Sequence, residues 1–172
     1  MSLIPTFEIG FWNAWIFLIP IFFMHIINAR VFARRGAGGQ SVKILIVLFL
    51  ILHILPVLLP LKLNTIWFYA GLIFYIVGTT MGYLAIYGFA TTPIDKPVSK
   101  GIFRYSRNPM YLGGFIFIIG ISLVSISWSY FLIALIWMII THVMEIPVEE
   151  SECIEKYGTA YIEYMKKTPK WL

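Results

Sequence analysis

Two polar stretches of this otherwise apolar chain carry the side chains that could do chemistry. Residues 91–108 hold Arg104 and Arg107 and end at the pair Asn108–Pro109, and residues 145–172 hold six of the eight acidic residues. Asn followed by Pro is typical of a helix start, because asparagine caps exposed amides and proline suits the first helical position. The free N–H groups and positive dipole end of such a helix, beside two arginines, indicate a site for an anionic or polar ligand.

Each stretch also has a purely structural explanation. The arginines and Asn108 would then be topology signals and an ordinary helix cap, and the acidic cluster would be the solvated face of an amphipathic helix. His25, His53 and His142 lie inside apolar segments, far apart in sequence and without a carboxylate partner. Hydrogen bonds between helices explain them better than a metal site does. We predict no metal site.

The composition indicates which elements hold these stretches in place. Of the 172 residues, 60% are hydrophobic and 12% are charged, whereas a soluble domain carries about 25% charged residues. An aromatic content of 17% excludes a disordered chain. A helix needs about 20 apolar residues to cross a bilayer. The apolar segments that approach this length are residues 11–32, 42–63, 66–89, 111–126 and 128–145.

We therefore predict an all-α polytopic membrane protein with about five transmembrane helices and a cytoplasmic C-terminal helix. The last two membrane helices form a hairpin, because only residues 125–128 join them. Pro56 and Pro60 predict a kink in the second segment. Gly78 and Gly82 form a GxxxG pair, which we interpret as a close helix contact. Residues 1–90 would supply three helices and residues 91–172, with both polar stretches, the other half of one structural unit.

The basic residues are distributed asymmetrically along these segments. With the N-terminus outside and five spans, Lys62 is the one basic residue outside and the other twelve of 13 are cytoplasmic. An excess of lysine and arginine marks the cytoplasmic side. The predicted topology is N-terminus outside and C-terminus cytoplasmic. It explains the net charge of +5 without nucleic acid and leaves membrane lipids as partners. The high isoleucine content and short loops favour a prokaryotic cell membrane.

The spacing of the polar residues is more specific than any one of them. Lys100 to Gly113 reads Lys-Gly-x-Phe-x-x-x-Arg-Asn-Pro-Met-Tyr-x-Gly, followed by Pro-x-Glu-Glu at 147–150 and Tyr-Gly-x-x-Tyr-x-x-Tyr at 157–164. Pro169-Lys-Trp171 follows. Together these motifs resemble those of the isoprenylcysteine carboxyl methyltransferase family and the related phospholipid methyltransferases. The resemblance covers about residues 95–171, and the first three segments match only as hydrophobic helices.

The resemblance implies an integral membrane enzyme that transfers a methyl group from S-adenosylmethionine, leaving S-adenosylhomocysteine, to a lipid or lipid-modified acceptor. The Arg-x-Pro motif that it shares falls on Arg107, and we take Arg107, together with Glu145, as the candidate catalytic residues. The cofactor contacts that it implies fall on the loop, the start of the fourth segment and the acidic tail. They are Asp95, Lys96, Pro97, Val98, Phe103, Asn108, Pro109, Met110, Tyr111 and Glu149.

Two positions depart from the family pattern. Asn108 stands where the family has histidine, and asparagine cannot act as a base near neutral pH. Glu145 stands where the eukaryotic carboxyl methyltransferases have an arginine, which can hold a substrate carboxylate. The family name therefore implies carboxyl methylation, whereas Glu145 favours an amine or another neutral nucleophile. Two alternatives remain: Glu145 pairs with Arg104 or Arg107, or the chain is a non-enzymatic membrane scaffold.

Overall fold

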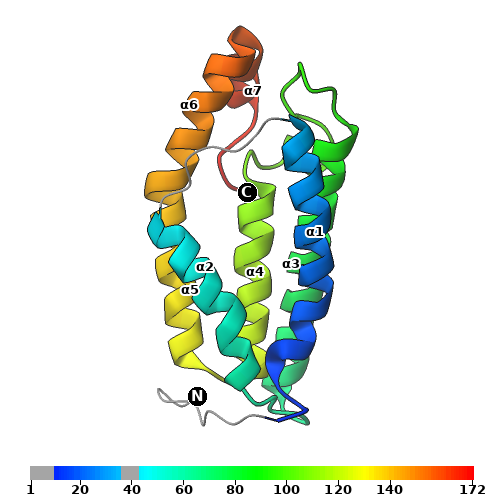
Figure 1. Ribbon diagram of the computed structural model, residues 1–172, viewed down its shortest axis with the longest axis vertical. Helices are drawn as coiled ribbons and strands as arrows, with labels where there is room; N and C mark the ends of the chain where they lie inside the picture. The colour runs from blue at the N-terminus through cyan, green and yellow to red at the C-terminus, as the bar shows by residue number, and fades with distance from the viewer. Residues whose placement is uncertain (1–9, 36–42) are drawn as a thin grey trace.

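The computed structural model describes residues 10–35 and 43–172, which consist of helices joined by short connections. The helices are α1 (Leu18–Arg35), α2 (Lys43–Ile54), α3 (Ile66–Thr91), α4 (Pro109–Val124), α5 (Trp128–Ile140), α6 (Ile146–Tyr157) and α7 (Thr159–Lys167). Helices α1 to α5 lie side by side along the long axis, and α6 and α7 lie at the upper end in Figure 1. We call this end, where α4 begins, the site end.

The lengths of the helices support a membrane protein. Three are long and apolar enough to cross a membrane, Ala14–Val31, Ile66–Thr91 and Trp128–Tyr157, and Ile44–Leu58 and Pro109–Val124 are shorter apolar helices. Each of the five predicted segments therefore contains a helix, although the second is helical only as far as Leu58, and the number of spans stays a prediction. The expected C-terminal helix is present as α6 and α7, but α6 continues from α5 through a π-helical turn (Thr141–Glu145).

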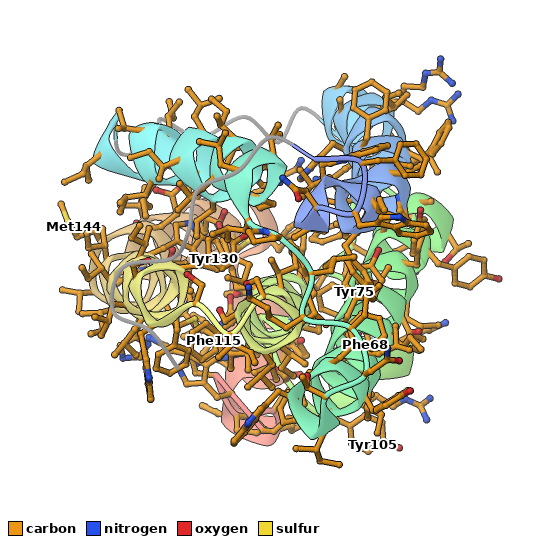
Figure 2. All side chains as sticks on the ribbon, turned by 90° about the horizontal axis from the view of Figure 1, so that it is seen from below. Phe68, Tyr75, Tyr105, Phe115, Tyr130 and Met144 are labelled. Atoms are coloured by element: carbon orange, nitrogen blue, oxygen red, sulfur yellow. The ribbon has the colours of Figure 1, made fainter. Side chains whose placement is uncertain are left out.

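Apolar side chains cover the outside of the bundle as well as its inside. Phe22 on α1, Ile54 on α2 and Ile73 on α3 are each 63% exposed. Seen along the bundle axis, Met144 points outward while Tyr130 lies among the helices (Figure 2). An apolar exterior of this extent is what a helix bundle presents to lipid, because no charged side chains are needed there.

The predicted kink in the second segment is confirmed at Pro56. Helix α2 ends at Ile54, and residues Leu55–Leu58 form a 3-10 turn. Proline has no N–H, so the carbonyl of Leu52 loses its usual partner four residues later. The hydroxyl of Tyr130, which is fully buried, donates to this carbonyl at 2.7 Å. The break in α2 thus supplies the acceptor that ties α2 to α5.

Glycines let α3 and α4 approach each other very closely. A Cβ on Gly71 would lie 2.7 Å from the Gly120 carbonyl oxygen, and one on Gly78 would collide with the backbone nitrogen of Phe117. Gly82 faces a different helix, because its Cβ would lie 2.7 Å from the sulfur of Met24 on α1. The GxxxG prediction is therefore confirmed as a packing feature, but its two glycines serve two neighbours. Close contact with α3 sets the position of the first turn of α4.

Candidate functional site

The α3–α4 loop and the C-terminal helices pack together at the site end. Val98 and Phe103 of the loop are buried with Tyr161 and Tyr164 of α7, and the Tyr164 hydroxyl donates to the Phe103 carbonyl at 2.8 Å. Burial raises the pKa of both Tyr161 and Tyr164, so their hydroxyls stay protonated donors. This small core fixes the loop against the tail.

Arg107 lies beside the N-terminus of α4 and pairs with a tail residue. Its Nη2 is 3.0 Å from Oε1 of Glu150 on α6, and Lys170 Nζ is 3.4 Å from the other carboxylate oxygen. Arg107 Nε is buried and has no hydrogen-bond partner in the described part of the chain. The predicted catalytic arginine is therefore held by Glu150, and one of its donors is still open for a ligand.

Asn108 occupies the predicted N-cap position of α4, but its side chain does not cap the helix. Among the described residues it makes no side-chain cap hydrogen bond. Its Nδ2 donates instead to the carbonyl of Lys170 at 3.1 Å, and Ser106 Oγ donates to the same carbonyl at 3.1 Å. The expectation of a capping asparagine is wrong, because the side-chain amide is turned so that its nitrogen bonds this carbonyl and its oxygen caps no helix N–H. The Asn108 side chain therefore occupies no N–H group in the first turn of α4.

The C-terminal segment packs against the start of α4. Besides the contacts to Lys170, the backbone N–H of Arg107 donates to the Pro169 carbonyl at 3.0 Å. Trp171 Nε1 donates to Nδ1 of His142 at 3.0 Å, and the two rings lie 5.6 Å apart. These contacts fasten the C-terminus to both α4 and the π-helical turn. The spacing of the sequence motifs does not predict these contacts.

The π-helical turn brings Glu145 to a buried position. Pro147 would clash with the carbonyl four residues earlier in a regular α-helix, and widening the preceding turn relieves that clash. Glu145 is 9% exposed and Thr141 is fully buried. Glu145 lies within electrostatic range of Tyr111 and Glu149. Pro147 inside a continuous apolar helix is the sequence signal that marks this turn.

Tyr111 and Glu149 form the shortest polar contact of the site. The Tyr111 hydroxyl, on the first turn of α4, donates to Glu149 Oε1, on the first turn of α6, at 2.6 Å. Trp137 of α5 packs against Tyr111 with ring centroids 6.3 Å apart. The structure therefore joins two residues that lie 38 positions apart in sequence.

The remaining predicted site residues fall into three groups. Pro109 is buried and Met110 partly buried in the first turn of α4, next to Tyr111. Val98 and Phe103 belong to the core between loop and tail, and Pro97 is partly buried beside them. Asp95 and Lys96 lie on an exposed part of the loop. The first turn of α4 and the acidic tail thus form the centre of the candidate site, and the early loop residues lie at its edge.

This arrangement combines an unpaired guanidinium nitrogen, a helix start without a side-chain cap, the buried carboxylate of Glu145 and the partly buried ones of Glu149 and Glu150 at one end of an apolar bundle. The sequence profile named phospholipid methyltransferase matches residues 46–160, which is more than half of the chain. Searches of curated proteins and of solved structures each found no match. The matched residues include α3 to α6, the whole first polar stretch and the second one as far as residue 160, so the chain belongs to the phospholipid methyltransferase family.

Proposed function

We propose that the protein is an integral membrane methyltransferase that moves a methyl group from S-adenosylmethionine to a lipid-borne amine. The observation that carries this proposal is the position of Glu145, buried within electrostatic range of the Tyr111–Glu149 pair. Family membership supports methyl transfer, and the apolar bundle supports an acceptor that arrives through the membrane.

The residues at the site end fit S-adenosylmethionine chemically. Its carboxylate matches the open Nε of Arg107 and the uncapped amides of α4. Its ammonium and ribose hydroxyls are donors, and Glu149 has a second carboxylate oxygen that Tyr111 does not use. Asn108, Pro109 and Met110 would line this position. The loop residues Asp95 to Val98, together with Phe103, would complete it from the side of α7.

When bound, the cofactor supplies a methyl carbon that the acceptor nitrogen attacks as the carbon–sulfur bond breaks. The protein then has to align the acceptor, remove water and take up one proton. An ammonium must lose that proton before its nitrogen can attack. Glu145 is a buried carboxylate suited to hold the ammonium and accept the proton. A carboxylate acceptor, as in isoprenylcysteine methylation, needs no base, and Glu145 would repel it.

We also propose that the site end faces the cytoplasm, with the N-terminus on the opposite side of the membrane. A water-soluble cofactor would then meet a lipid acceptor at the inner membrane edge. The distribution of lysine and arginine supports this orientation.

The first test is binding of S-adenosylhomocysteine to the detergent-purified protein by calorimetry. We expect micromolar binding that is lost in Glu149→Ala and Tyr111→Ala. Glu155→Gln is the control, because Glu155 is an exposed tail glutamate. A folded wild-type protein that does not bind would refute the methyltransferase proposal and leave the scaffold alternative.

The second test identifies the acceptor. Transfer of a labelled methyl group is measured to vesicles that contain phosphatidylethanolamine and, separately, to a prenylcysteine analogue. We expect transfer to the amine lipid, with strong loss in Glu145→Gln because the proton acceptor is removed. Full turnover of the amine lipid in Glu145→Arg, or transfer only to the prenylcysteine analogue, would contradict the assignment of Glu145.

A further inference from the structure

Asn28 is a polar residue within the apolar helix α1, near the site end of the segment Ala14–Val31. Its Nδ2 lies 3.8 Å from the sulfur of Met110, the second residue of α4. Its Oδ1 is buried and has no hydrogen-bond partner among the described residues. An unsatisfied polar atom inside a membrane helix is costly and usually marks a functional position.

The other intramembrane polar residues near Asn28 are satisfied by each other. His25, one turn earlier on α1, has its Nε2 3.0 Å from Nε2 of His53 on α2. The second ring nitrogen of His53 contacts the Phe49 carbonyl at 2.7 Å. This pair has a complete structural explanation as a link between α1 and α2. Asn28 has no comparable explanation.

The open atom of Asn28 is an acceptor, and this limits what can fill it. Sulfur is a weak acceptor, so the amide nitrogen is the atom that faces Met110 and the oxygen is the atom left over. A continuous helix interior has no free N–H to offer this oxygen. Buried threonine hydroxyls, such as those of Thr79 and Thr141, differ because they can rotate toward a carbonyl of their own helix.

We propose that Asn28 is a specificity-determining residue that accepts a hydrogen bond from the amine headgroup of the lipid acceptor. Through Met110, it adjoins the turn that carries Tyr111, and Tyr111 in turn contacts Glu149. The headgroup nitrogen would then donate to the uncharged amide oxygen of Asn28 on α1 and contact the carboxylate of Glu145 on the π-helical turn. A carboxylate headgroup has no donor for this oxygen. The inference rests on the proposed amine acceptor and adds a second determinant of it.

The test compares the wild type, Asn28→Leu and Asn28→Asp in phosphatidylcholine vesicles that contain increasing phosphatidylethanolamine. Methyl transfer gives KM and kcat, calorimetry gives the affinity for S-adenosylhomocysteine, and a melting curve gives the thermal midpoint. Asn28→Leu should raise the KM for phosphatidylethanolamine about tenfold or more, the usual effect of losing a hydrogen bond to a charged group. Its affinity for S-adenosylhomocysteine should not change, and Asn28→Asp should keep a low KM because it keeps the acceptor oxygen.

Thermal stability separates this role from a structural one. Asn28→Leu removes a buried unsatisfied oxygen, so its thermal midpoint should equal or exceed that of the wild type. His25→Leu is the matched control on the same helix: it breaks the link to His53, so its midpoint should fall while its KM stays unchanged.

A lower midpoint and an unchanged KM in Asn28→Leu would overturn the inference and leave the proposed function intact. A wild type that binds S-adenosylhomocysteine but methylates only the prenylcysteine analogue would refute both proposals. Retention of the wild-type KM in Asn28→Leu, whatever its stability, counts against a contact with the headgroup.

Discussion

The hydrogen bond between Tyr111 and Glu149 allows a quantitative test of how the site is organised. Tyr111→Phe removes one hydroxyl and keeps the ring that packs against Trp137. The 2.6 Å distance is that of a hydrogen bond to a charged oxygen. Such bonds contribute about 1.5–3 kcal/mol, and the carboxylate left behind loses the donor that Tyr111 supplies. We therefore expect a loss of about 1.5–3 kcal/mol in the free energy of unfolding.

The same variant reports on cofactor binding if Glu149 contacts the cofactor. Without the hydroxyl, Glu149 is free to turn away, and we expect the affinity for S-adenosylhomocysteine to fall by about tenfold, or about 1.4 kcal/mol. Calorimetry measures the affinity, and urea unfolding followed by circular dichroism in detergent measures stability. Tyr105→Phe is the control, because it makes the same chemical change at a tyrosine that is 67% exposed.

A double-mutant cycle decides whether Tyr111 acts through Glu149. If it does, Tyr111→Phe combined with Glu149→Gln should bind S-adenosylhomocysteine no more weakly than Glu149→Gln alone. Independent roles would make the two losses in binding free energy add. Additive losses, or a Tyr111→Phe protein with wild-type affinity, would refute the idea that this hydroxyl positions the carboxylate.

Three further predictions concern the packing of the helices and the role of Arg107 in cofactor binding. Gly78→Ala should lower the thermal midpoint far more than Gly82→Ala, because the new Cβ meets fixed backbone at the first position and a flexible thioether at the second. Tyr130→Phe should destabilise the fold by about 1–3 kcal/mol in chemical unfolding, since it leaves a buried carbonyl unpaired. Arg107→Lys should weaken S-adenosylhomocysteine binding in calorimetry although the charge is kept, because lysine lacks the Nε donor. Wild-type behaviour in Gly78→Ala, Tyr130→Phe or Arg107→Lys would contradict the corresponding contact.

The helices could be predicted from the sequence because the bilayer sets the length of an apolar helix that crosses it. An apolar segment in a membrane must satisfy its own backbone, so hydropathy predicts helices directly. The start of α4 at Pro109 and the break at Pro56 were also predictable, since proline acts on the backbone locally. The continuation of α5 into α6 was not anticipated, because the acidic residues after Glu145 suggested that the apolar helix ends there.

The composition of the site was predicted better than its contacts. The motifs pointed to the first turn of α4 and to Glu149, and the structure joins these two regions. The partner of Arg107 was missed. Glu149 and Glu150 are adjacent residues of the same type, and only the direction of each side chain from α6 decides which one meets Arg107. The capping role given to Asn108 was wrong because its side-chain amide is turned toward a carbonyl from the far end of the chain.

The sequence by itself determined that this chain is an all-helical membrane protein of the phospholipid methyltransferase family, with its polar chemistry in two separate stretches. Apolar length and motif spacing are local properties, so they can be read from the chain directly. Only the tertiary structure decided which side chains meet. The closure of the tail over α4, the burial of Glu145 and the open oxygen of Asn28 depend on contacts between residues far apart in sequence. Such contacts arise from packing between helices, which sequence periodicity alone does not specify.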